Sequence, residues 1–312
     1  MSPTARRARA LAPYVIAVGA LVWVAATTPI AAVGDALEHV SWWRLCAIAV
    51  PYILALLIAD SIALWVSLRV SLKVSLRFKD VVLVRGASYL LALVNYGAGQ
   101  GGIVWFLHRR HDVPLARATG AVLLTTGAFL LAVVGAVAGG LALEAVPEAN
   151  LTWLLWLVAF GLPAYLALVW IRPQFLARHA LLAPLFDAGV FGTLAATAAR
   201  SLHLGILIAA HALAYRLFGI EVPIRAALVL FPIIFLVQAL PIAPVGLGPT
   251  QATAKTLLAR FVAVPGADGI VVAASLGFQA ISTLLMVLVG LVCLRWEEAH
   301  PATEADPSDT TG

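Results

Sequence analysis

The chain has 312 residues, of which 62% are hydrophobic and only 11% are charged. A soluble domain is about 45–50% apolar and about 25% charged, so this composition excludes a water-soluble enzyme, a nucleic-acid-binding module and a disordered chain. The net charge of +5 therefore bears on membrane topology. Two cysteines, Cys46 and Cys293, are too few for a disulfide scaffold.

Four stretches of the first half are apolar enough to enter a membrane: 11–33, 42–66, 81–107 and 118–143. The first follows three arginines and is longer than a signal-peptide core, so we expect an uncleaved helix. Asp35 and Glu38 are expected in a short acidic loop after it. Residues 67–80 alternate between polar and apolar types and include four basic side chains, which predicts an interfacial segment.

The second half repeats this order, with apolar stretches at 151–171, 191–217, 224–260 and 269–294. A mixed loop is expected at 172–187, and the polar residues 297–312 predict a disordered cytoplasmic tail. The third stretch of each half is interrupted: 81–107 by Asn95–Gly102, and 224–260 by Pro241–Pro249. We expect a single integral membrane domain, 1–296, with halves of about 11–143 and 151–294.

The two interrupted stretches leave two topologies open. Each either crosses the membrane, giving eight transmembrane helices, or turns back at its break, giving six transmembrane helices plus two re-entrant hairpins. Lys and Arg are in excess on cytoplasmic loops. The hairpin topology places fourteen of them inside and five outside, whereas eight crossings give eleven and eight. The count favours two opposed hairpins in an inverted repeat, with both termini cytoplasmic in a plasma (inner) membrane.

Both breaks have the residue types that bind anions. Glycines allow close approach to the backbone, and the free N–H groups at a helix N-terminus attract phosphate. Paired broken segments in inverted halves also point to a transporter's central site. The alternative is that the glycines serve helix packing. The candidate substrate-binding residues at the breaks are Asn95, Gly97, Gly99, Gln100, Gly101, Gly102, Pro244, Gly246, Gly248 and Gln251.

These two stretches carry a family resemblance. Asn95 followed by the glycine-rich run, a basic loop and a helix resembles the first signature of the lysylphosphatidylglycerol synthetase transmembrane region, a flippase-like family. Ala239–Gly248 resembles the second signature of that family. The family usually has an acidic residue after each motif, where this chain has Gln100 or Gly102 and then Gln251. It also tends to have a charged pattern in the next helix, where 124–129 is neutral here. A divergent member is therefore expected.

The resemblance implies translocation of an anionic, aminoacylated or glycosylated lipid between leaflets. The soluble aminoacyl-transfer domain of the synthetases is not found in these residues, so lipid synthesis is not implied. The expected partners are membrane lipids and not nucleic acid, and no cofactor is expected. The sequence leaves open a membrane enzyme acting on a lipid-linked substrate and a small-solute or ion transporter.

Ionisable residues inside membrane helices usually have a function. Arg200, His203 and His211 share one predicted helix, and their spacing places them near one face. We expect Arg200 and His203 to bind a lipid phosphate, with Asp60 as a possible partner of Arg200 or proton carrier. The alternatives are carbonyl pairing for the histidines and an interfacial position for Arg200.

The basic loop at the first break contains Arg109 and Arg110, whose forked guanidinium groups suit phosphate. The alternative is a topology signal that also attracts anionic lipid headgroups. The chain lacks the metalloprotease, Walker and Gly-x-Ser-x-Gly motifs. We therefore expect a protein without enzymatic activity, although the sequence does not exclude one.

Overall fold

The structure is a computed structural model that describes residues 22, 26, 30–72, 74, 76–93, 96–143, 156–239 and 246–299. These residues form helices, and within them four helices are long and apolar enough to cross a membrane. The four are α3 (Trp42–Leu72), α6 (Leu115–Ala142), α10 (Ala183–Arg216) and α13 (Ala267–Ala299). The chain is therefore an all-helical membrane protein, as its composition predicts.

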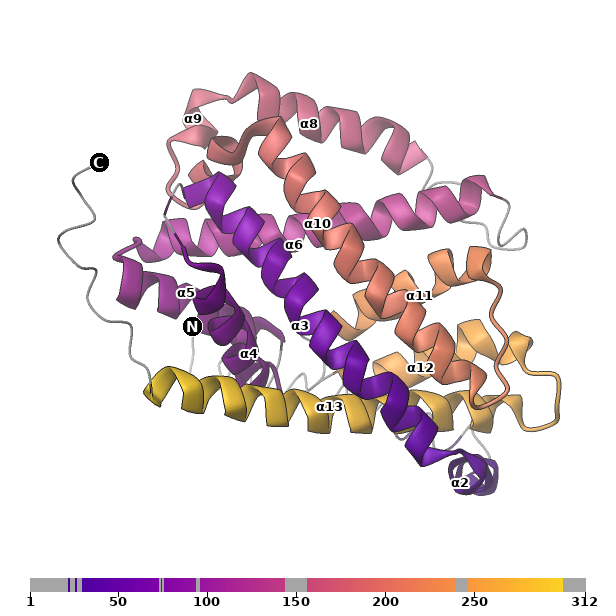
Figure 1. Ribbon diagram of the computed structural model, residues 1–312. Helices are drawn as coiled ribbons and strands as arrows, with labels where there is room; N and C mark the ends of the chain where they lie inside the picture. The colour runs from indigo at the N-terminus through magenta and orange to yellow at the C-terminus, as the bar shows by residue number, and fades with distance from the viewer. Residues whose placement is uncertain are drawn as a thin grey trace, which may run out of the picture.

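The long helices build the frame of the molecule. In Figure 1, α3 and α10 run side by side across it, and α13 extends along one edge. Helix α6 packs against both α3 and α10. Beside this frame lie α2 (Ile30–His39), the π-helical turn η1 (Leu157–Gly161), α8 (Leu162–Ile171) and the short α9 (Gln174–Ala177).

The first interrupted stretch forms two short helices, α4 (Phe78–Ala92) and α5 (Tyr96–His111), which pack against each other. At about 1.5 Å per residue each is about 22–24 Å long, shorter than the bilayer core of about 30 Å. Gly102 of α5 lies against Leu91 of α4. At the far ends of the pair, Asp80 and His111 are close enough to interact electrostatically. The start of α4 and the end of α5 therefore lie near each other.

The second interrupted stretch has the same form. Helix α11 (Ile224–Ala239) is followed by α12 (Pro249–Leu258) and a 3-10 turn, η3 (Ala259–Phe261). Ile220, before the pair, forms an antiparallel bridge with Val262, after it. The Glu221 N–H also donates to the Phe261 carbonyl over 3.3 Å. These contacts hold together the two ends of 220–262, so this helix pair also opens at one end only.

The two helix pairs open at opposite ends of the molecule. Val81 and Phe106 of the first pair share a core cluster with Leu68, near the C-terminus of α3. Ile220, at the mouth of the second pair, shares a core cluster with Leu45, near the N-terminus of α3. Figure 1 shows α4 and α5 towards the left of the molecule and α11 and α12 towards the right.

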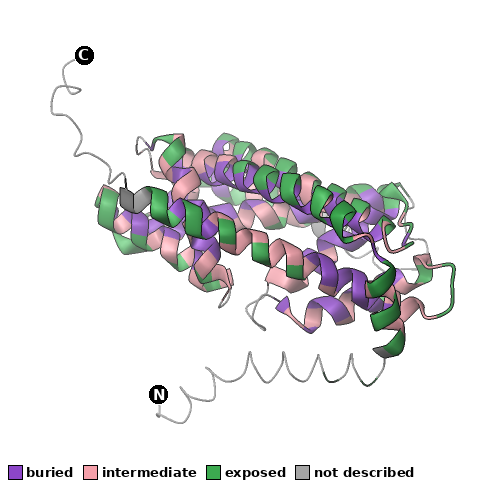
Figure 2. Ribbon diagram, turned by 60° about the horizontal axis from the view of Figure 1, so that its bottom comes forward, coloured by how far each residue is buried: buried purple, intermediate pink, exposed green. Residues whose placement is uncertain are grey.

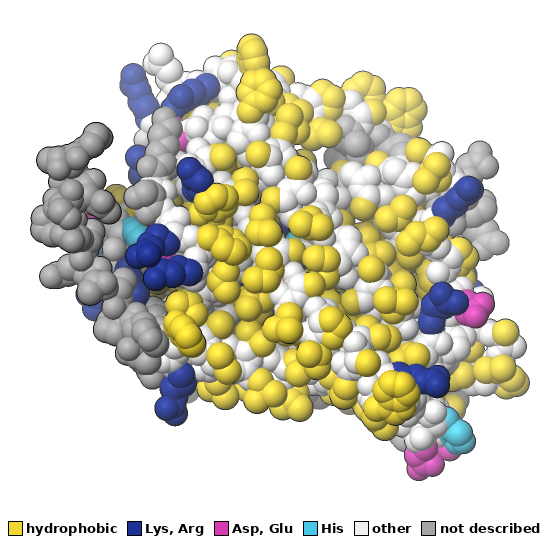
Figure 3. Space-filling view, in the orientation of Figure 1, with side chains coloured by type: hydrophobic (Ala, Val, Ile, Leu, Met, Phe, Trp, Pro, Cys, Tyr) yellow, Lys and Arg dark blue, Asp and Glu magenta, His cyan; other side chains and the backbone are white. Residues whose placement is uncertain are grey.

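The surface agrees with a membrane environment. Figure 2 shows exposed residues along the outward faces of the long helices and buried residues on the faces that meet their neighbours. Many exposed side chains are large and hydrophobic, such as Trp43, Phe191 and Val292. In Figure 3, hydrophobic side chains cover the middle of the molecule, while Lys and Arg gather mainly at the end where α4 and α5 open.

Some element boundaries differ from the sequence prediction. Asp35 and Glu38 lie in α2 and not in a loop. The predicted interfacial segment 67–80 is largely helical, because α3 continues to Leu72 and α4 begins at Phe78. Ser67 and Ser71 are accommodated in α3 by donating to carbonyls four residues earlier.

Two further boundaries differ in the second half, and two predicted segments lie partly or mostly outside the described residues. The predicted loop 172–187 contains α9 and the start of α10. Helix α13 continues to Ala299, so it includes the first residues of the predicted tail, and the rest of that tail lies outside the described residues. Most of the predicted first span, 11–33, also lies outside them.

Candidate functional site

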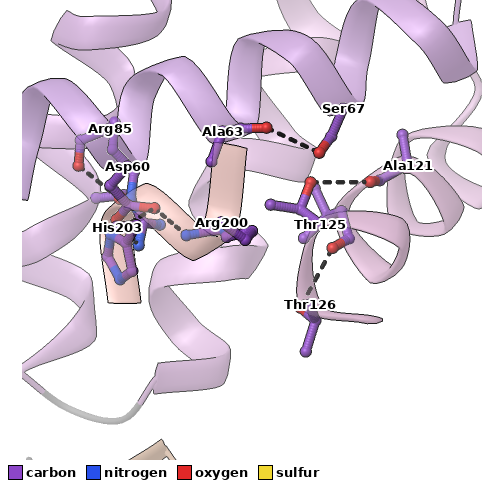
Figure 4. Close-up of polar contacts among 11 residues, drawn as sticks. Asp60, Ala63, Ser67, Arg85, Ala121, Thr125, Thr126, Arg200 and His203 are labelled. Atoms are coloured by element: carbon purple, nitrogen blue, oxygen red, sulfur yellow. Dashed lines mark hydrogen bonds and ion pairs between the residues drawn. The ribbon is translucent and has the colours of Figure 1, made fainter. Parts of the chain in front are cut away.

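Asp60 lies at the centre of the molecule, where α3, α4 and α10 meet. Its side chain is 2% exposed. Arg85 of α4 donates from Nη2 to Asp60 Oδ2 over 2.5 Å, and Arg200 of α10 donates from Nη1 to Asp60 Oδ1. Figure 4 shows both guanidinium groups approaching the same carboxylate from different helices. Two positive groups share one negative group, so the trio has one excess positive charge.

His203 lies one helical turn after Arg200 and faces the same carboxylate. Its Nδ1 is 4.0 Å from Asp60 Oδ1, and its ring stands edge-on to Phe129 of α6. The expectation that Arg200 and His203 share a face of one helix is confirmed, and so is the pairing of Asp60 with Arg200. Asp60, Arg85, Arg200 and His203 are called the ionic cluster below.

The ionic cluster forms part of the wall of a cavity of about 210 Å³. Every major element of the frame contributes to this wall, and so do both helix pairs: Leu93 comes from the end of α4, Tyr96 from the first break and Gly246 from the second. The cavity therefore lies between the two breaks, and both halves of the chain are needed to enclose it.

Unpartnered polar atoms concentrate on this cavity. Among the described residues, six buried side-chain nitrogen or oxygen atoms have no hydrogen-bond partner within the protein. Five belong to cavity-lining residues: Tyr89 Oη, Arg200 Nε, His203 Nδ1, Thr250 Oγ1 and Ser282 Oγ. Buried polar groups are normally paired, so these atoms mark a place where a polar ligand would complete the hydrogen bonding. Four of the five, all except His203 Nδ1, can donate a hydrogen bond in any tautomer, and an oxyanion would accept from such donors.

The rest of the wall is aromatic and apolar. The ring of His211 packs against Tyr52, Phe235 and Phe278, with ring centroids 4.7–5.9 Å apart. Its Nδ1 lies 2.8 Å from the Leu207 carbonyl, so one ring nitrogen is already paired with the backbone. The cavity thus combines a cationic region with an apolar region. Within the described ranges, no group of three or more His, Cys, Asp or Glu side chains could hold a metal ion.

The second break is held by one glutamine. Gly246 and Gly248 both have positive φ angles, 71° and 88°, a conformation that glycine adopts without steric cost. Gln251 Oε1 accepts from the Gly248 N–H over 2.7 Å, and Gln251 Nε2 donates to Gln279 Oε1 of α13 over 2.6 Å. Gln251 is fully buried and does not line the cavity. It fixes the turn that places Gly246 in the cavity wall.

The residues predicted at the first break have different positions. The glycines from Gly97 to Gly102 lie in the first turns of α5. Gly99 packs against the Ala92 side chain and the Ser88 carbonyl of α4, so part of the run serves helix packing. Gln100, Gly101 and Gly102 do not line the cavity. Asn95 and, at the second break, Pro244 lie outside the described residues.

Arg109 and Arg110 lie away from the cavity, at the exposed end of α5. Each guanidinium group lies over an aromatic ring of its own helix, Arg109 over Trp105 at 5.0 Å and Arg110 over Phe106 at 5.7 Å. The structure therefore brings Arg200, His203 and Gly246 together around one cavity and places these two arginines on the surface.

Arg85 was missed as a site residue by the sequence analysis. It is one of the fourteen Lys and Arg residues that the hairpin topology places inside, and a loop position is wrong, because Arg85 is 8% exposed and ion-paired with Asp60. The charge count leaves Arg200 within the membrane but assigns Arg85, near the start of its apolar stretch, to a loop. The signal that could have identified it was available, since Arg85 lies inside an apolar stretch, as Arg200 does.

Comparison with known proteins gave one family. The family model described as "Lysylphosphatidylglycerol synthase TM region" matches residues 10–290. No curated protein and no solved structure gave a match. The matched range includes the ionic cluster and both breaks.

Proposed function

The chain belongs to the lysylphosphatidylglycerol synthase transmembrane region family, and from this we propose that it binds an anionic membrane lipid in the central cavity and moves its headgroup between leaflets. The lipid is a phosphatidylglycerol-type phospholipid, or an aminoacylated or glycosylated lipid with the same phosphate. Membrane lipids are then its partners.

The observation that carries this proposal is the charge of the cavity. Arg85 and Arg200 share a single counter-ion, Asp60, in a membrane protein. A buried excess charge is costly unless something pairs with it, and an anionic headgroup would do so. Arginine also binds phosphate with well-defined geometry. The aromatic wall around His211 offers an apolar environment for the part of the lipid next to the phosphate.

The arrangement of the helix pairs supports movement between leaflets. We propose that both are re-entrant hairpins and that the two halves form an inverted repeat. Gly140 of α6 packs against the Arg225 carbonyl of α11, while Gly290 of α13 packs against the Gly86 carbonyl of α4. These contacts correspond if α6 is exchanged with α13 and α11 with α4. In transporters with inverted repeats, broken helices surround a site that opens to each side in turn.

The proposal is tested by reconstitution into vesicles of phosphatidylcholine with a trace of fluorescent phosphatidylglycerol in both leaflets. Protection of the fluorophore from an external quencher reports movement between leaflets. Wild-type protein should make nearly all of the label accessible. Arg200→Gln should slow this movement at least tenfold, because it removes the excess positive charge. Arg216→Gln is the matched control, since Arg216 is exposed on the same helix.

Other outcomes would support another function. If wild-type protein leaves the inner-leaflet label protected, the lipid-translocation proposal is wrong. Chemical conversion of the labelled lipid, seen by mass spectrometry, would identify a membrane enzyme. Flux of a trapped solute without lipid movement would identify a solute or ion transporter. If Arg216→Gln is as slow as Arg200→Gln, the cavity is not the route.

A further inference from the structure

We propose that Asp60 takes up one proton when an anionic group binds between Arg85 and Arg200, so that the cavity binds and moves one anion together with one proton. This inference rests on the proposed function and adds the coupling ion to it. The argument depends on how the carboxylate of Asp60 is held and on the charge that the cavity encloses.

Asp60 and an anionic ligand compete for the same donors. Arg85 donates from both Nε and Nη2 to Asp60 Oδ2, and Arg200 donates from Nη1 to Asp60 Oδ1. Both carboxylate oxygens are therefore engaged. Arg200 Nε, by contrast, has no partner and belongs to a residue that lines the cavity. A phosphate oxygen can reach the cluster at this atom, and it gains full bidentate contact with the guanidinium group only by drawing it away from Asp60.

The loss of donors from Asp60 when an anion binds favours protonation of its carboxylate. Without ligand, two arginines and one carboxylate give a net charge of about +1. An anion that takes over the guanidinium groups leaves Asp60 as a buried carboxylate with weakened pairing, which is strongly unfavourable. A proton from water on one Asp60 oxygen removes the cost of that carboxylate, while the anion keeps both arginines paired and the site has the same net charge, about +1, as without ligand. When the anion leaves, Asp60 returns the proton and pairs with both arginines again, so charge and protons balance over the cycle.

The groups that face Asp60 from each packed helix favour this assignment. They are Tyr52 of its own helix, Arg85 and Tyr89 of α4, and Arg200 and His203 of α10. No second carboxylate is among them. Among these groups, His203 is the one with a reference pKa near neutrality, and its Nδ1 faces Asp60 at 4.0 Å. A proton on either group gives the site the same net charge, but only a proton on Asp60 removes the buried carboxylate that has lost its donors.

The test measures protons taken up on binding, by calorimetry in buffers that differ in ionisation enthalpy. The protein is the full chain in detergent, and the probe is dioctanoyl phosphatidylglycerol. Wild-type protein should take up about one proton per lipid bound, and its affinity should rise about tenfold for each pH unit lowered while the free site keeps Asp60 ionised. Asp60→Asn should take up none and bind with little dependence on pH. Asp80→Asn, the same change outside the cavity on α4, should behave as wild type.

The results separate this inference from the proposed function. Lipid binding and movement with no proton uptake would overturn the coupling and leave the proposed function standing. Absence of both binding and movement would overturn both. His203→Gln should keep the proton uptake, and its loss there would assign the proton to the histidine and contradict the role of Asp60. If Asp60→Asn does not fold, the proton count of the wild-type protein and of His203→Gln decides.

Discussion

At the scale of single residues, Asp60 and Gln251 have different tasks. Asp60 sets the charge of the cavity by holding two arginines. Gln251 is buried beneath the second break and joins the Gly248 N–H to Gln279 of α13. Its neutral amide both accepts and donates, which a carboxylate at this position could not do. Gln251 was expected among the substrate-binding residues. In the structure its contacts hold the turn at Gly248 against α13.

Gln251→Ala should lower the free energy of unfolding by about 1–3 kcal/mol, because it leaves the buried Gly248 N–H without its acceptor. Thermal unfolding of the purified protein in detergent measures the change. Thr253→Ala is the control: Thr253 is on the same helix, is only part-buried, and donates to the Pro249 carbonyl. Equal loss of stability in the two variants would contradict the role given to Gln251.

At the scale of elements, the contacts within the second helix pair bear on the choice between the two topologies. If 224–260 crossed the membrane once, Ile220 and Val262 would lie on opposite sides. In the structure they form an antiparallel bridge. Opposed residues of such a bridge have Cα atoms about 4.5–5.5 Å apart, within the range that a disulfide spans.

The double variant Ile220→Cys/Val262→Cys, with Cys46 and Cys293 changed to serine, should therefore form a disulfide in native membranes. Protease cleavage between the two positions, followed by electrophoresis with and without reductant, detects the link. Each single-cysteine variant serves as a control for links between molecules. Failure of the double variant to form a link under mild oxidation would contradict the returning path of α11 and α12.

The breaks were predictable because their signals are local. Glycine and proline interrupt a helix wherever they cluster, and both clusters lie in otherwise apolar stretches. The ionic cluster was only half predictable. Asp60 and Arg200 are 140 residues apart, and their pairing could be proposed because each is a rare charge inside a predicted span. Arg85 was missed because it lies near the start of its apolar stretch, directly after a basic segment, and was counted together with that segment.

At the scale of the whole molecule, basic residues distinguish the two ends. Arg109 and Arg110 mark the end where α4 and α5 open. Near the same end, Asp187 at the start of α10 pairs with Arg117 at the start of α6 and with Arg172, directly after α8. Arg260 lies near the opposite end, in η3. Because Lys and Arg collect on the cytoplasmic side, we propose that the first end and both termini are cytoplasmic.

Single cysteines at these ends check the orientation. In a chain without its native cysteines, Arg110→Cys should react with a membrane-impermeant maleimide only after the membrane is opened. Arg260→Cys should react in intact cells. Labelling of position 110 from outside would reverse the orientation or exclude the hairpin topology. Labelling of both positions from the same side would show that the helix pairs do not open in opposite directions.

The division of the ionic cluster between the two halves has a consequence for biosynthesis. Asp60 and Arg85 are made first and neutralise each other, so the first half can enter the membrane without an unpaired charge. Helix α10 arrives later with Arg200, and an arginine at the centre of a helix costs about 2.5–3.5 kcal/mol on insertion. Arg85 binds Asp60 at Oδ2, so Oδ1 remains available to accept a hydrogen bond from Arg200 when α10 inserts. Because α10 is synthesised after Asp60, the ion pair between Arg200 and Asp60 favours packing of the second half of the chain against the first.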